Sequence, residues 1–198
     1  MTDRSRRCGA WLLAFVTLAA SPASADPRLS FVAAARAQVG RMVLYDPAYR
    51  RIAFPNGDVP EDRGVCTDVV IRALRSAYGY DLQRELNTDI RREPAAYPKR
   101  WGLTSADSNI DHRRVPNLQV FFRRRGWEKP ATQDARDYRT GDLVTQMLPG
   151  NLPHIAIVSD RHSAEGRPLV LHNIGAGARE EDTLFAFPIT GHYRFEKP

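Results

Sequence analysis

Three residues of this chain are suited to covalent chemistry: one cysteine and two histidines. Cys66 follows Gly64 and Val65, and the apolar residues after it recur at the three- and four-residue spacing of a buried helix face. Free N–H groups and the positive dipole end at a helix start favour a thiolate and can hold an oxyanion. Cys66 is therefore a candidate nucleophile; the alternative is a small buried hydrophobic residue, as most free cysteines are.

A cysteine nucleophile needs a base, and the base needs a partner that holds its ring. His154 opens one β-prone run and His172 ends the next, so adjacent antiparallel strands would bring both to one end of a sheet. We predict that His154 is the base and His172 the orienting group, with Asn173 as the substitute for His172. Because consecutive strand residues point to opposite faces, only one of these two can meet His154. For either histidine alone, the alternative is a structural role at a strand end.

The polar segment 109–114 contains a second group of candidates. His112 and Arg113 would line a cleft in which an arginine pairs with a substrate carboxylate. The alternative is a loop held by its own salt bridges. His162 lies in a polar turn and His192 is interpreted as structural. No His, Cys or Asp pair has a zinc-motif spacing, so we expect no metal and no cofactor.

The elements that must position these residues divide into two halves. Helices are predicted over residues 26–39, from Cys66 to Gly79, over 82–92 and from Pro116 to Gly126, with a long loop over 41–64. Short β-prone runs follow at 143–147, 154–159, 168–173 and 185–195. Helices followed by strands predict an α+β fold, with the Cys66 helix packed across a C-terminal antiparallel meander.

The first 25 residues have the features of a signal peptide. Arg4, Arg6 and Arg7 precede a short apolar run, and Ala23-Ser24-Ala25 fits a cleavage site after Ala25. An uncleaved anchor is the alternative. Residues 26–198 are expected to form one domain that is periplasmic or secreted, without a stable membrane anchor. Cys8 would leave with the signal peptide, so one thiol would remain in a compartment where cysteines tend to pair.

Several motifs resemble known families. The segments 141–144, 154–158 and 169–172, together with a cysteine at a helix start, resemble the NlpC-type papain-like cell-wall peptidases. The segments 57–60, 64–68, 109–118 and 172–177 more narrowly resemble the bacterial family called domain of unknown function 1287, over nearly the whole mature chain. Fold-level analogy is a weaker warrant for function than a site.

The peptidase resemblance implies a papain-like fold and a Cys66, His154, His172 triad. It also implies a tyrosine near the oxyanion pocket, for which Tyr45 is the nearest match by order and Tyr49 the second. The peptidases commonly carry Asp-Cys-Ser-Gly at the nucleophile, whereas this chain has Val-Cys-Thr-Asp, and it has an extra segment over 109–117. Both differences lie where substrate would bind. The expected substrate-binding residues are Tyr45, Asp68, His112, Arg113 and Asn173.

These observations predict an exported cysteine hydrolase that cleaves an amide bond, with a peptidoglycan stem peptide or another envelope amide as substrate. The alternatives are a non-catalytic envelope-binding module on the same fold and a cysteine acyltransferase. Without the predicted signal peptide the net charge falls from +6 to +4, which is mild, and arginine is spread along the chain. An exported protein would rarely meet nucleic acid, so no nucleic-acid partner is expected. We expect a monomer.

Overall fold

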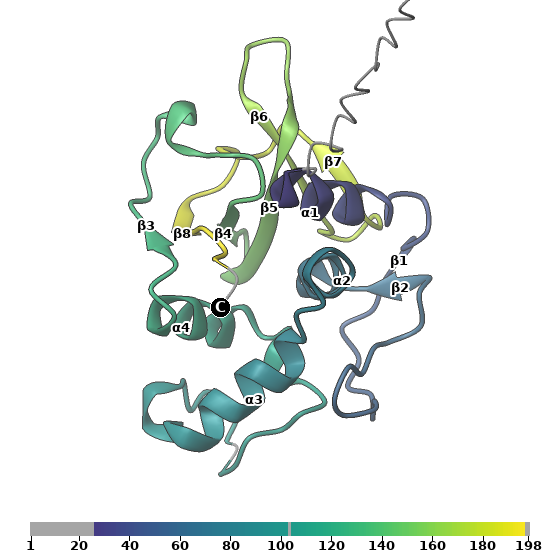
Figure 1. The fold of residues 1–198 in the computed structure, drawn as a ribbon, viewed down its shortest axis with the longest axis vertical. Coiled ribbons are helices and arrows are strands. Elements are labelled where there is room, and N and C mark those ends of the chain that lie inside the picture. The colour runs from purple at the N-terminus through teal and green to yellow at the C-terminus, as the bar shows by residue number, and fades with distance from the viewer. Residues whose placement is uncertain (1–25, 103, 197–198) are drawn as a thin grey trace, which may run out of the picture.

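The computed structural model describes residues 26–102 and 104–196 (Figure 1). The expected signal peptide, its cleavage site and Cys8 lie outside the described residues. Four α-helices precede most of the strands: α1 (Pro27–Arg36), α2 (Cys66–Tyr78), α3 (Leu82–Arg92) and α4 (Val115–Arg124). Short 3-10 turns lie at Pro94–Ala96, Asp111–Arg113 and Ala135–Asp137. The predicted helices are confirmed, with boundaries that differ by a few residues.

Local chemistry explains where two of these helices begin and end. The Asp26 side chain accepts a hydrogen bond from the Arg28 N–H, and Pro27 occupies the first turn of α1. Gly79 ends α2 in the left-handed conformation with φ 64°. The first cap therefore fixes where α1 begins, and the second fixes where α2 ends.

The strands form a six-stranded antiparallel sheet with the order β3-β8-β4-β5-β6-β7. Its members are β3 (Glu128–Lys129), β4 (Leu143–Leu148), β5 (Leu152–His162), β6 (Pro168–His172), β7 (Arg179–Glu181) and β8 (Ile189–Tyr193). From β4 to β7 the strands follow one another as a meander. The last strand does not continue it, because β8 returns to pair with β4. That placement corrects the simple meander, and β3 and β7 were not predicted.

A second, smaller sheet lies in the long loop that precedes the cysteine. Here β1 (Leu44–Tyr45) runs parallel to β2 (Arg63–Gly64), and the register pairs Tyr45 with Gly64. The loop returns along itself, so a tyrosine 21 residues upstream of the cysteine is fixed beside the residues that lead into α2.

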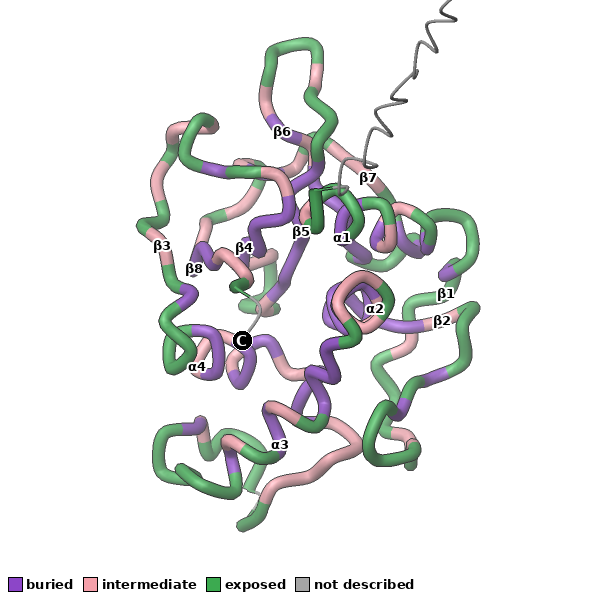
Figure 2. Tube along the Cα trace, viewed as in Figure 1, coloured by how far each residue is buried: buried purple, intermediate pink, exposed green. Residues whose placement is uncertain are grey.

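The main core fills the space between the helices and one face of the sheet. Helices α1 and α2 pack together and against β5, and their buried residues stand out in Figure 2. Phe31, Leu74, Ile155 and Ile157 are each at most 1% exposed. Ile155 and Ile157 alternate with Ala156 and Val158, which belong to a second apolar cluster with Tyr138 and Leu184. Helix α3 lies beyond α2 and α4, away from the sheet.

The observed architecture is α+β, with helices packed on a C-terminal antiparallel sheet, as the sequence predicts. In the described part of the chain, no helix combines the length and the apolar character needed to span a bilayer.

Candidate active site

Cys66 is the first residue of α2, as predicted. The Asp68 carboxylate accepts a hydrogen bond from the Val65 N–H at 2.6 Å and so caps the helix from inside its first turn. Gly64 allows this close approach. A Cβ at this position would lie 2.9 Å from Asp68 Oδ2, closer than real Cβ contacts come, and 3.1 Å from Met42 Cε, so a side chain here would force its neighbours to shift.

The thiol of Cys66 is buried, with 5% of the residue exposed. Burial raises the pKa of Cys66 to about 11, and the nearby Asp68 charge acts in the same direction. Backbone hydrogen bonds from Ile155 and from the helix start oppose this effect without reversing it. The expectation of a favoured thiolate is therefore wrong for the resting protein, because desolvation outweighs the helix terminus. The Ile155 contact also places the sulfur against the residue that follows His154.

His154 and His172 meet as predicted. His154 Nε2 lies 3.0 Å from His172 Nδ1, and both residues are almost fully buried. Strands β5 and β6 pair Ile157 with Leu171, so continuing this register brings the two histidines onto one face. With Nε2 of His154 engaged by His172, Nδ1 is the ring nitrogen that remains for another partner.

Both imidazoles favour the neutral state. Burial, followed by the charge of His172, lowers the pKa of His154 to about 3. Burial also lowers the pKa of His172, and the neighbouring Glu181 carboxylate opposes this shift. At neutral pH the site therefore holds a protonated thiol and an uncharged base.

Glu181 was missed by the sequence interpretation. Its Oε2 lies 3.0 Å from His172 Nε2, which extends the His154–His172 pair to a third residue. Glu181 lies on β7, which has only three residues and reads Arg-Glu-Glu. Such a segment has no apolar alternation, so the only available signal was its position one turn after the His172 strand.

Tyr45 lies near the thiol, as the resemblance implies. The pKa of Tyr45 is raised, first by partial burial and then by the charge of Cys66. Tyr45 is 45% exposed, so its ring borders both the thiol and solvent. Tyr49 lies elsewhere, with its hydroxyl donating to Asp107 at 3.1 Å.

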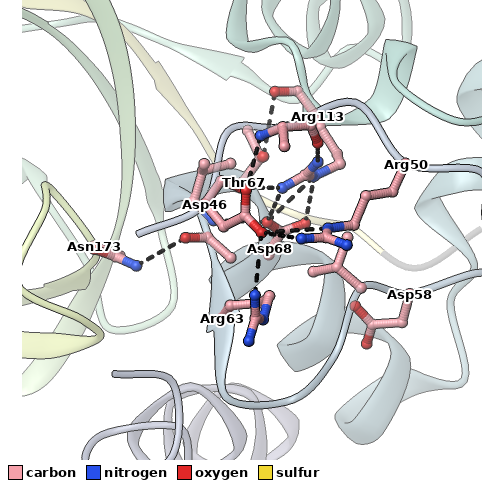
Figure 3. A network of polar contacts seen from close by, with 12 residues as sticks. Asp46, Arg50, Asp58, Arg63, Thr67, Asp68, Arg113 and Asn173 are labelled. Atoms are coloured by element: carbon pink, nitrogen blue, oxygen red, sulfur yellow. Dashed lines mark hydrogen bonds and ion pairs between the residues drawn. The ribbon is translucent and has the colours of Figure 1, made fainter. Parts of the chain in front are cut away.

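Arg113 and Asp68 are placed differently from the expectation that they bind substrate. They form a buried ion pair in which Arg113 Nη2 lies 2.9 Å from Asp68 Oδ2, with side chains 2% and 4% exposed (Figure 3). Arg113 also donates to the carbonyls of Asp46 and Ala48. The guanidinium thus ties the Tyr45 loop to the start of α2 instead of facing a cleft, because its donors are occupied by groups of the chain itself.

His112 and Asn173 are also structural in this arrangement. His112 is 2% exposed, and burial lowers its pKa to about 4. It therefore does not line a cleft as expected. Asn173 points away from His154 and donates to the Gly64 carbonyl at 3.1 Å (Figure 3). The geometry thus pairs His172, and not Asn173, with the base.

His192 has a hydrogen-bond partner within the chain at each ring nitrogen. His192 contacts Asp142 Oδ2 at 2.8 Å and the Pro130 carbonyl at 2.9 Å, which agrees with a structural interpretation. Within residues 26–102 and 104–196, no group of three or more His, Cys, Asp or Glu side chains is arranged to hold a metal ion.

Comparison with known proteins finds a matching family, a similar relative and a similar solved structure. The family described as "Domain of unknown function (DUF1287)" matches residues 32–195. A protein of Escherichia coli (strain K12) named "Uncharacterized protein YijF" is 50% identical over 171 residues, which cover 86% of this chain and 83% of that protein. The solved structure "Structure of NlpC1 from Trichomonas vaginalis" is similar with a TM-score of 0.46 and 10% identity, covering 90% of this chain. The chain spans about half (47%) of that structure's length. On the family match and the 50% identity, the chain belongs to the DUF1287 family.

Proposed function

We propose that this protein is a cysteine hydrolase that cleaves an amide bond with Cys66 as nucleophile and His154 as base. The observation that carries the proposal is the His154–His172 pair, with 3.0 Å between ring nitrogens, in which His154 directly precedes Ile155, whose backbone contacts the Cys66 thiol. A nucleophile, a base and a group that orients the base are the parts that acyl transfer by a cysteine requires.

The charge states define the first step. Because the raised pKa of Cys66 and the lowered pKa of His154 keep the proton on sulfur, His154 accepts it while the sulfur attacks the carbonyl carbon. Backbone N–H groups at the start of α2 donate to the oxyanion that forms. His154 then gives its proton to the leaving amine. A water molecule, deprotonated by His154, hydrolyses the thioester and restores the thiol.

The proposed substrate is the peptide stem of peptidoglycan. Two features support it: the predicted signal peptide would deliver the chain to the envelope, where this polymer is the abundant amide, and the sequence motifs resemble cell-wall peptidases. Tyr45, half-exposed beside the thiol, is the side chain best placed to contact a bound peptide.

A non-catalytic envelope-binding module is the second candidate. The observation that favours it is the burial of Cys66, because a protonated thiol that is 5% exposed resembles ordinary core packing. This candidate predicts binding to the cell wall that is independent of the thiol.

One experiment separates these candidates. Purified peptidoglycan sacculi and soluble stem peptides are incubated with the mature protein, with Cys66→Ala and with the surface control His162→Ala, and the products are resolved by mass spectrometry. Hydrolysis predicts new amine and carboxylate ends with the wild type and with His162→Ala, and none with Cys66→Ala. Equal product from Cys66→Ala would refute the hydrolase.

Two further results of the same experiment separate the alternatives. Sedimentation of the protein with sacculi, equal for wild type and Cys66→Ala and without any product, would support the binding module. Added amines, such as free diamino acids, that appear in the products in place of water would identify acyl transfer instead of hydrolysis.

A further inference from the structure

The polar row that starts at His154 ends on a carboxylate. Glu181 Oε2 lies 3.0 Å from His172 Nε2, and His172 Nδ1 lies 3.0 Å from His154 Nε2. His172 therefore has one ring nitrogen toward Glu181 and the other toward His154, which leaves Nδ1 of His154 as the nitrogen outside this row. Whether His154 can act as a base depends on which ring nitrogen of each histidine carries the proton.

We propose that Glu181 is a positioning residue that sets the tautomers of both histidines, so that His154 presents a lone pair at Nδ1. This inference rests on the proposed function for its catalytic consequence. The tautomers themselves are a property of the free protein.

Proton counting gives the argument. An ionised carboxylate only accepts hydrogen bonds, so the proton of neutral His172 must lie on Nε2. His172 Nδ1 is then an acceptor, and His154 must donate to it from Nε2. A neutral His154 with its proton on Nε2 has its lone pair on Nδ1, where it can accept a proton from a thiol.

The reverse arrangement satisfies the two histidines equally well in the absence of Glu181. His172 would donate from Nδ1 to His154 Nε2, and His154 would then carry its proton on Nδ1. Such a ring cannot act as a base toward Cys66. The 3.0 Å contact between the histidines is thus compatible with an active and an inactive arrangement, and the carboxylate selects the active one.

Sheet register explains how Glu181 reaches His172. Strands β6 and β7 pair His172 with Arg179, and Glu181 lies two residues further along on the same face. Glu180 points to the other face, where it bonds to Arg36 and Ser159. Two adjacent glutamates therefore have separate roles, and Glu180 offers a matched control.

The other charged contact of Glu181 is weak. Its Oε1 lies 3.7 Å from Arg179 Nη1, and its side chain is 33% exposed while that of His172 is 1% exposed. Replacement of Glu181 therefore removes the contact to His172 without opening the core.

The test is long-range proton–nitrogen NMR of ¹⁵N-labelled mature protein at neutral pH, with no substrate present. Wild type, Glu181→Leu, Glu181→Ala, Glu181→Gln and Glu180→Gln are compared, and signals are assigned with His154→Gln and His172→Gln. Wild type is expected to show both histidines with the proton on Nε2. Glu181→Leu and Glu181→Ala are expected to move both toward the Nδ1-protonated form. Glu181→Gln, whose amide oxygen can accept the same bond, and Glu180→Gln should retain the wild-type pattern.

Activity on stem peptides supplies the second readout. For Glu181→Leu we expect kcat to fall by about 10- to 100-fold, the range of one hydrogen bond to a charged group, with KM little changed and recovery in Glu181→Gln. Unchanged tautomers in both Glu181→Leu and Glu181→Ala would overturn the proposal, and so would displaced tautomers with an unchanged kcat. Because the NMR readout needs no turnover, inactivity of the wild type would refute the hydrolase while leaving the tautomer result to stand by itself.

Discussion

Two polar clusters lie near the start of α2, and they differ in charge: one holds neutral groups and the other an ion pair. The proposed catalytic row (Cys66, His154, His172 and Glu181) holds a protonated thiol and neutral imidazoles, because burial shifts the pKa values of Cys66 and the two histidines toward the uncharged forms. The anchor pair (Asp68 and Arg113) joins a carboxylate and a guanidinium by hydrogen bonds of 2.9 to 3.3 Å.

The difference fits the role proposed for each cluster. A site that moves a proton needs groups that can exist in two states without unfolding the protein, and neutral buried groups satisfy this. A scaffold needs fixed geometry, and a hydrogen-bonded ion pair supplies it as long as both partners remain. Arg113 and Asp68 hold the Tyr45 loop and the helix start in place, which would keep the proposed catalytic row in a fixed geometry.

The largest expected effect is on the neutral row. His154→Ala removes the base, and we expect kcat/KM on stem peptides to fall by about 10²- to 10⁴-fold, the usual contribution of general acid–base catalysis. The measurement is steady-state hydrolysis by the folded variant, with urea unfolding as the check on stability. His162→Ala, at the exposed end of the same strand, should retain wild-type kcat/KM. Comparable loss in both variants would contradict the assignment of His154.

The anchor pair should respond through stability. Arg113→Met leaves the Asp68 charge buried and unpaired, so the free energy of unfolding should fall by about 3–5 kcal/mol. The double variant with Asp68→Asn removes the orphaned charge and should recover part of this loss. Urea unfolding of both single variants and the double variant gives the coupling energy. Strictly additive losses would show that the two side chains do not act as a pair.

The smallest effect per residue is expected from pH. The pKa values of His112 and His154 are lowered to about 4 and about 3 in the folded protein. Below about pH 6.5 these two histidines are therefore protonated in the unfolded chain while they stay neutral in the folded chain. Their contribution to the free energy of unfolding is therefore fully present above about pH 6.5. It is lost as the pH falls toward the pKa values of the folded protein, by about 1.4 kcal/mol per pH unit for each histidine. Urea unfolding between pH 7 and pH 5 measures this slope.

A variant sharpens the pH comparison. His112→Gln removes one buried titrating group. It should reduce the slope of the unfolding free energy against pH by about 1.4 kcal/mol per pH unit, whatever the stability of the variant at pH 7. Asp68→Asn leaves both histidines and the Arg113 charge that lowers the pKa of His112 in place, and it should keep the slope. An unchanged slope in His112→Gln would mean that His112 already titrates in the folded protein.

Much of the frame followed from local pattern. The α2 helix was predicted from the spacing between Val69 and Leu74 and from Gly79 as its stop, and the structure confirms both. The histidine pairing also followed, because period-two geometry allows only one of His172 and Asn173 to face His154. The return of β8 to pair with β4 was not predicted, since short strands of similar composition do not specify their neighbours.

The sequence by itself determined the order of helices and strands and the three residue types of the candidate site, because periodicity and residue chemistry are local properties. Only the tertiary structure decided that Glu181 joins His172, that Arg113 pairs with Asp68 from 45 residues away, and that the thiol is buried. Each of these depends on sheet register or on packing between distant segments. Desolvation likewise depends on what covers a group, and for this reason the charge state of Cys66 is opposite to the one that its helix position predicts.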